Sequence, residues 1–133
     1  MTEEEVFRRF SGPALAYLGD SVMDLMIKSY FLKNGNMQAE KYHKKVTAIV
    51  NARSQAVFAE NIQDRLTETE KDIYRRGRNA SVHTHAKNAT LGEYKKATGL
   101  EALFGYLYLT GQQERMESLI LDLIRSHGED HEL

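Results

Sequence analysis

Apolar residues recur along nearly all of the chain with the helical period of about 3.6 residues, and little strand-like alternation is present. This pattern predicts an all-α fold. In chain order, we expect a short helix after Thr2, a helix ending near Lys33, helical regions over about 39–61 and 67–76, a strongly apolar helix over about 92–110, and a last helix through 116–124 that ends at Gly128.

Polar residues and glycines indicate where these helices begin and end. Two pairs have the capping-box spacing that starts a helix, Thr2 with Glu5 and Thr67 with Glu70. Asn34-Gly35-Asn36 should end the second helix in a left-handed cap, and Gly111 should close the apolar helix. We expect the third helical region to bend near Asn51 and the polar stretch 78–90 to form a loop.

The sequence predicts a single domain over residues 1–133, with 129–133 as a frayed tail. Pro13 is the only proline, and no linker-like stretch or internal repeat interrupts the helical pattern. The chain has no cysteine, which excludes disulfides and thiol nucleophiles and fits the reducing cytoplasm. Its N-terminus is acidic, unlike a secretion signal, and no apolar stretch is long enough to span a bilayer, so we expect no membrane association.

Charge is unevenly distributed, although the formal net charge is only -1. Residues 71–96 contain seven Lys or Arg and two acids, a formal +5, whereas residues 114–133 contain two Arg and six acids, a formal −4. A basic segment of this kind is typical of a nucleic-acid contact, but a solvated basic helix end has the same composition. Tyr42 and His43, beside Lys44 and Lys45, leave the same two interpretations open.

Two acidic residues occur where apolar residues are expected. Asp20 follows Gly19 within the second helix, near its apolar stripe, and Glu101 lies within the most apolar run of the chain. Gly19 costs about 1 kcal/mol relative to Ala in a helix, which is tolerable where another helix must approach closely. A buried carboxylate must be paired, hydrogen-bonded, protonated or bound to a cation, and two together would suit Mg²⁺. Pairing of each acid with a buried cation or backbone group is the alternative.

His83 and His85 have a spacing that could hold a transition metal, but a third ligand is not evident. A solvated loop is the better interpretation, and whether the two histidines have a role stays open.

Three stretches, 15–22, 46–56 and 101–109, resemble the ribonuclease III family in their order and spacing. Leu18-Gly19-Asp20-Ser21 is similar to the family's signature helix, and the stretch from Glu101 is similar to its other metal-binding helix. Within the family the chain is most similar to Mini-III, the minimal bacterial branch that lacks the double-stranded-RNA-binding domain. The resemblance implies the helical fold of the ribonuclease III endonuclease domain.

The resemblance also implies a magnesium-dependent, double-strand-specific endoribonuclease that acts as a cytoplasmic homodimer. It implies maturation of 23S ribosomal RNA precursors, with a large-subunit ribosomal protein as a further partner. Asp20 and Glu101 are the implied catalytic and metal-binding residues, and Tyr17 the implied dimer contact. The implied RNA-binding residues are Arg75, Arg76, Arg78, Asn79, Lys87 and Asn88.

The chain departs from the family at three positions where ribonuclease III has acids, Pro13, Ala16 and Thr98. A second metal ion would therefore have few protein ligands. The alternative function is a non-catalytic RNA-binding or ribosome-associated protein that kept the fold. Loss of Asp20 or Glu101 would favour that alternative, and both are present. A phosphohydrolase of small nucleotides is a third interpretation, disfavoured by a basic segment outside the two acid-bearing helices.

Overall fold

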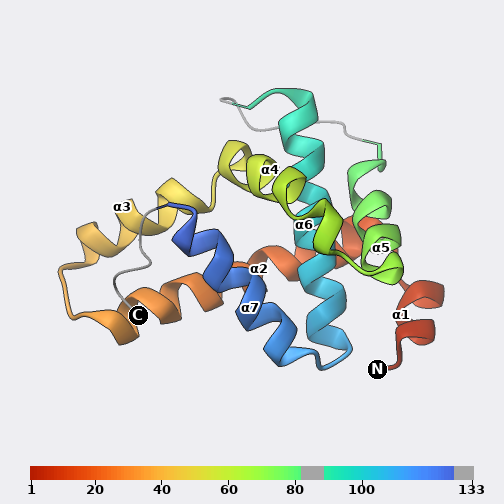
Figure 1. Cartoon of the computed structure of the whole chain (residues 1–133), viewed down its shortest axis with the longest axis horizontal. Helices are drawn as coiled ribbons and strands as arrows, with labels where there is room; N and C mark the ends of the chain where they lie inside the picture. The colour runs from red at the N-terminus through yellow and green to blue at the C-terminus, as the bar shows by residue number, and fades with distance from the viewer. Residues whose placement is uncertain (82–88, 128–133) are drawn as a thin grey trace.

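The computed structural model describes residues 1–81 and 89–127. Within these ranges it contains α-helices, one short 3-10 helix and no strand, which confirms the predicted all-α fold (Figure 1). The elements are α1 (Glu3–Arg9), α2 (Gly12–Asn34), α3 (Ala39–Ile49), α4 (Ala52–Asn61), η1 (Gln63–Arg65), α5 (Glu68–Arg78), α6 (Leu91–Leu109) and α7 (Gln113–Arg125). In the described ranges, no helix is long and apolar enough to cross a membrane.

The capping boxes predicted from the sequence are confirmed at the starts of α1 and α5. A third capping box, which sequence analysis missed, pairs Thr90 with Glu93 and starts α6 at Leu91. Gly111 has the left-handed φ of 71° expected where the chain leaves α6. Each cap pairs backbone groups that the first or last turn of a helix would otherwise leave without a partner.

The end of α2 differs from the prediction, because Gly35 is extended (φ 166°, ψ 134°) rather than left-handed. Side chains replace the expected cap. The Asn34 amide donates to the Tyr30 carbonyl at 2.8 Å, and the Tyr42 hydroxyl donates to the Gly35 carbonyl at 2.7 Å. These bonds satisfy backbone carbonyls at the helix end and fix the turn into α3.

The region 39–61 is two helices, so one continuous helix with a bend is wrong, although the break lies near Asn51 as expected. The Asn51 side chain serves both helices. Its amide donates to the Ala48 carbonyl at the end of α3 (2.9 Å), and its oxygen accepts from the Ser54 amide at the start of α4 (2.9 Å). One asparagine thereby ends one helix and begins the next.

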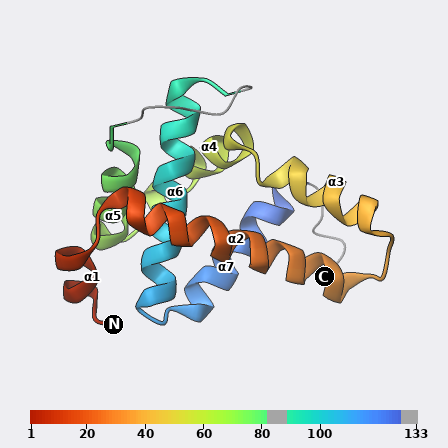
Figure 2. The ribbon, with the colours of Figure 1, turned by 180° about the vertical axis from the view of Figure 1, so that it is seen from behind.

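Helix α6 forms the centre of the domain and packs against α2, α5 and α4. Figure 2 shows α2 crossing in front of α6, with α5 and α4 on either side of the crossing. The middle of α6 is buried nearly all round, which explains why its sequence is the most apolar of the chain. Its buried residues include Leu100, Ala102, Leu103, Phe104, Tyr106 and Leu107.

Two glycines allow α2 and α6 to cross almost in backbone contact. A Cβ on Gly19 would lie 1.7 Å from the Glu101 carbonyl oxygen, and one on Gly105 would lie 2.1 Å from the Leu15 carbonyl oxygen. This close approach accounts for a glycine inside α2, where it would otherwise only cost helix stability. Since Asp20 directly follows Gly19, the same contact brings the two predicted acids together.

Candidate functional site

The α2–α6 crossing places the side chains of Asp20 and Glu101 next to each other, within hydrogen-bonding reach. Glu101 is partly buried beside the crossing, as expected for an acid within an apolar run. Asp20 is exposed, so its predicted place near the core stripe is wrong. Gly19 occupies the buried side of this turn, and Asp20 lies at the edge of the crossing, open to solvent.

The surroundings of Glu101 disfavour its charged form. Burial, the neighbouring Asp20 carboxylate and their mutual hydrogen bond together raise the pKa of Glu101 to about 8. In the described part of the chain, neither acid forms an ion pair with Lys or Arg. Two adjacent carboxyl groups without a cation hold a proton between them, and a divalent cation would relieve the same repulsion.

Other acids on apolar helices do have cationic partners. Asp24 pairs with Lys28 at 2.8 Å, and Asp122 pairs with Arg65 at 2.6 Å. The negative charges of Asp24 and Asp122 are thus compensated within the fold, unlike those of the two acids at the crossing.

The pair at the crossing offers only two protein ligands. Among residues 1–81 and 89–127, no group of three His, Cys, Asp or Glu side chains could hold a metal ion. A site of the zinc type, with three or four protein ligands, is therefore not present in these ranges. Magnesium fits the two carboxylates better, because it retains several waters and needs one or two carboxylates together with substrate phosphates.

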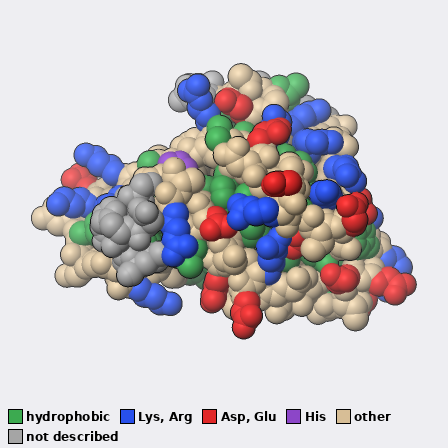
Figure 3. All heavy atoms as spheres, in the orientation of Figure 1, with side chains coloured by type: hydrophobic (Ala, Val, Ile, Leu, Met, Phe, Trp, Pro, Cys, Tyr) green, Lys and Arg blue, Asp and Glu red, His purple; other side chains and the backbone are tan. Residues whose placement is uncertain are grey.

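The basic residues at the end of α5 point in different directions. Arg75, Arg78 and Asn79 lie at or beside the end of the helix with exposed or partly exposed side chains. Arg78 lies over the Tyr74 ring and donates to the Asn79 side chain at 3.1 Å. Lys and Arg side chains gather over α5 at one end of the molecule and over α3 at the other (Figure 3). Lys87 and Asn88 lie outside the described residues, as do His83 and His85.

Comparison with known proteins gives a consistent assignment. The family model of the ribonuclease III domain matches residues 13–112 of this chain. A Mini-ribonuclease 3 from Enterococcus faecalis is 41% identical over 128 residues, covering 95% of this chain and 97% of that protein. A Mini-ribonuclease 3 from Streptococcus pneumoniae is 42% identical, covering 83% and 88%. A crystal structure of a protein from Fusobacterium nucleatum superposes with a TM-score of 0.84 at 34% identity, covering 92% of this chain and 98% of that one.

The chain belongs to the ribonuclease III family, in its Mini-ribonuclease 3 branch. It is therefore a ribonuclease of the endonuclease type. The predicted family and the ribonuclease III fold are both confirmed.

The structure of this ribonuclease III domain explains how the three departures from the family pattern are accommodated. Ala16 is buried, Pro13 is exposed in the first turn of α2, and the Thr98 hydroxyl donates to the Tyr94 carbonyl at 2.9 Å. None of the three supplies a carboxylate near Glu101. Asp20 and Glu101 are thus the acids that the crossing itself brings together.

Arg76 has a structural role that sequence analysis missed. Its guanidinium donates to the Phe7 carbonyl at 2.8 Å and lies 4.5 Å from the Phe7 ring centroid. These contacts attach α1 to α5, and they involve residues 69 positions apart. The prediction that Arg76 binds RNA stays a prediction, but its side chain already serves the fold.

An apolar stripe runs along the outer side of α2 of the ribonuclease III domain. Tyr17 is 84% exposed, Leu25 67% and Leu32 63%. Leu25 therefore lies on the outer side of α2 and not in the core. The helix is apolar on two sides, and the spacing of Tyr17, Leu25 and Leu32 is the sequence signal that could have revealed the second side.

Proposed function

We propose that this ribonuclease III domain is a magnesium-dependent endonuclease specific for double-stranded RNA. The observation that carries the proposal is the juxtaposition of Asp20 and Glu101 with no cationic partner in the described residues. Bound magnesium would supply an activated water and positive charge for the scissile phosphate. Cleavage would leave 5′-phosphate and 3′-hydroxyl ends, as the family resemblance implies.

The two acids have different tasks in this proposal. Asp20 is exposed and would hold the cation from the open side of the crossing, whereas Glu101 would hold it from the partly buried side. Because burial raises the pKa of Glu101 to about 8, this carboxyl group must release its proton when it binds the cation at neutral pH. The backbone contact at Gly19 fixes the distance between the two helices, and so prepares the ligand positions in advance.

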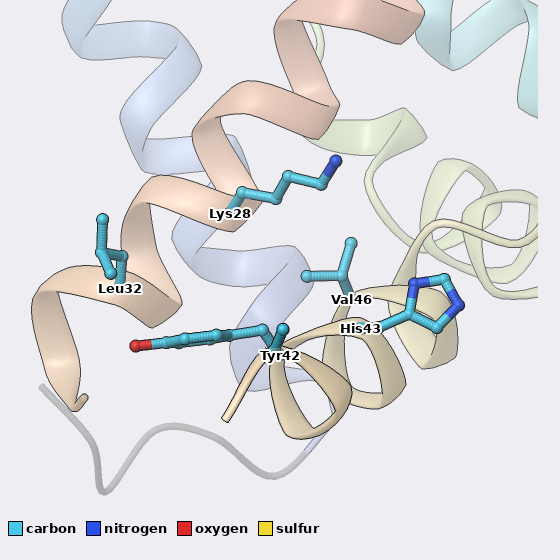
Figure 4. Close-up of a pocket in the computed structure, with 6 residues that line it drawn as sticks. Lys28, Leu32, Tyr42, His43 and Val46 are labelled. Carbon is cyan, nitrogen blue, oxygen red and sulfur yellow. The ribbon is translucent and has the colours of Figure 1, made fainter. Parts of the chain in front are cut away.

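Homodimerisation through the outer side of α2 is part of the proposal. A large tyrosine that is 84% exposed is typical of an interface residue. A pocket of about 300 Å³ lies farther along the same helix, between α2 and α3. Figure 4 shows Lys28 and Leu32 of α2 on one side of this pocket and Tyr42, His43 and Val46 of α3 on the other.

The occupant that we propose for this pocket is Tyr17 of a second copy. In a twofold dimer the stripe of one protomer packs antiparallel against the same stripe of the other protomer. The beginning of one stripe therefore meets the end of the other. Tyr17 lies at one end of the stripe, and the pocket at Lys28 and Leu32 lies at the other. Two sites related by a twofold axis would match the two antiparallel strands of a duplex.

The dimer can be tested by sedimentation of Tyr17→Ala. We expect the dissociation constant to rise about 30-fold, because a buried interface tyrosine contributes about 2 kcal/mol. Leu91→Ala removes another exposed apolar side chain away from the stripe and serves as the control. A wild-type protein that is monomeric at micromolar concentration, or equal effects of the two substitutions, would contradict the dimer.

Recognition in the proposal depends on A-form shape and phosphate contacts, since side chains cannot read the deep major groove of duplex RNA. Arg75, Arg78 and Asn79 are the described candidates, with Lys87 and Asn88 implied by the resemblance. The resemblance also suggests the cytoplasm as location, 23S ribosomal RNA precursor as substrate, and a large-subunit ribosomal protein as partner.

The function is tested by incubating the protein with duplex RNA, single-stranded RNA and nucleotides, each with magnesium or with a chelator. We expect cleavage of the duplex alone, only with magnesium, and none by Asp20→Asn. Binding of the duplex without cleavage under any condition would favour the non-catalytic RNA-binding alternative. Hydrolysis of nucleotides would favour the small-molecule phosphohydrolase.

A further inference from the structure

The surface of α3 has a basic character that the proposed site does not use. Helix α3 contains three lysines, Lys41, Lys44 and Lys45, and one acid, Glu40, a formal +2. Lys41 and Lys44 are exposed, and neither forms an ion pair with any residue in the described ranges. Solvated lysines are common, so the position of this surface relative to the catalytic pair decides whether it has a role.

Asp20 and α3 lie on the same side of α2. Asp20 and Phe31 are about three full helical turns apart, and so project from one side of the helix. Helix α3 covers that side at Phe31, where the Lys45 ammonium lies 5.6 Å from the ring centroid. Figure 2 shows α6 crossing the first half of α2 and α3 lying along its second half. Within one protomer, about 16 Å of helix axis therefore separates the acids from the part of α2 that α3 covers.

The proposed dimer shortens this separation. When Tyr17 enters the partner's pocket between Lys28 and Leu32, it lies opposite about position 30 of the partner's antiparallel α2 helix. Each residue of α2 then lies opposite the partner residue whose number, added to its own, gives about 47. Asp20 then lies opposite the partner subunit's Lys28, to within about one turn. Lys28 lines the pocket together with His43 and Val46 of α3, so the partner's α3 is beside Asp20.

The twofold axis also keeps the two features on a common side. The twofold axis of two antiparallel helices that lie side by side is perpendicular to the plane containing both helices. The side of each helix that faces along this axis therefore faces the same direction in both protomers. The flank that carries Asp20 in one protomer is therefore continuous with the flank that carries α3 in the other. The result is one groove with the acid pair of one subunit next to the lysine surface of its partner.

We propose that Lys41 and Lys44 of each protomer bind phosphates of the RNA strand that is cut by the Asp20–Glu101 pair of its partner. The proposal depends on the proposed nuclease function and dimer. Each active site would then be composite, with metal ligands from one chain and phosphate contacts from the other. Lysine suits this task, since a point charge can bind a phosphate of any sequence.

Mixed dimers separate this arrangement from one in which α3 serves its own site. Two differently tagged chains are co-expressed and purified through both tags, with Glu101→Gln marking a catalytically dead chain and Lys41→Ala with Lys44→Ala marking a chain with an altered α3. In one dimer, all three substitutions are in one chain and the other chain is wild-type. In the second dimer, Glu101→Gln is in one chain and the two lysine substitutions are in the other. Each dimer has one intact acid pair, and its nicking of a duplex is measured as kcat/KM.

We expect about tenfold lower kcat/KM in the first dimer, because its intact acid pair faces the altered α3. The second dimer should equal a dimer that carries Glu101→Gln alone in one chain, since its intact acid pair faces an unaltered α3. Arg8→Ala with Arg125→Ala removes two other exposed cations and replaces the lysine pair in the control dimers.

Equal rates in the two dimers would overturn the proposal, and the reverse order would show that α3 serves its own subunit. Equal losses with the arginine control would also overturn it, because the effect would then be one of net charge. Absence of cleavage by the wild-type protein would instead contradict the proposed nuclease function, and a wild-type monomer would contradict the dimer. Circular dichroism of the lysine variant confirms its fold, since both side chains are exposed.

Discussion

Glu70 and Glu101 are glutamates on helices packed in the core, but their surroundings shift their pKa values in opposite directions. Arg115 donates to both Glu70 carboxylate oxygens, at 3.0 and 2.9 Å, and the Thr67 amide donates at 2.9 Å. Burial would raise the pKa of Glu70, but these hydrogen bonds lower it overall. Glu101 faces the Asp20 carboxyl instead, and burial and repulsion raise its pKa to about 8.

The difference shows how a carboxylate that serves the fold can be distinguished from one that serves a site. The negative charge of Glu70 is satisfied within the chain, by a cap at the start of α5 and an arginine from α7. Glu101 has no such cation in the described residues, and the fold nevertheless holds it beside a second acid. The missing positive charge must come from a proton or from a bound ion.

The largest expected effect concerns catalysis. Glu101→Gln should lower kcat/KM for duplex RNA by at least about a thousandfold, because an amide cannot replace a carboxylate in holding magnesium. Glu70→Gln is the matched control, since it makes the same chemical change at a buried glutamate of α5 that pairs with Arg115. It should retain cleavage within a few-fold at a temperature where it is folded. Comparable losses in the two variants would show that Glu101 acts through stability alone.

The next effect concerns stability, and here Glu70→Gln should be the more damaging of the two substitutions. Glu70→Gln weakens the bonds to Arg115 and should lower the free energy of unfolding by about 1–3 kcal/mol at neutral pH. The pKa of Glu70 is lowered in the folded state, so its contribution is present above its ordinary value of 4.5 and is lost as pH falls. Urea titrations at several pH values should show the wild type and the variant converging in acid. A constant difference down to pH 3 would contradict this account.

The smallest effect is a pH dependence of the metal-free protein. The pKa of Glu101 rises from 4.5 to about 8 on folding, so it favours the folded state below pH 4.5 and this advantage disappears as pH rises toward 8. In a chelator, the Tm of wild type should fall between these pH values relative to Glu101→Gln, whose amide does not titrate. Thermal unfolding followed by circular dichroism measures this, and parallel pH profiles would refute it.

The helices and the two acids were predictable because they depend on local pattern. Capping boxes and apolar periodicity fix most helix ends, and Glu101 is conspicuous in an apolar run. The exposure of Asp20 was not predictable, because it depends on the angle at which α6 crosses α2. The contact of Arg76 with Phe7 was missed for a similar reason, since it joins residues 69 positions apart. Periodicity shows which residues share a helix face, but not which element that face meets.

Counting bound manganese tests most directly whether Asp20 and Glu101 form a cation site. Mn²⁺ shares the oxygen ligands of magnesium and is visible by electron paramagnetic resonance in its free form. Titration of wild type, Asp20→Asn, Glu101→Gln and Glu70→Gln at pH 8 gives the number and affinity of sites in each. We expect a site in wild type and in Glu70→Gln that is lost or weakened at least about tenfold in the other two. Equal binding by all four proteins would show that the cation site lies elsewhere.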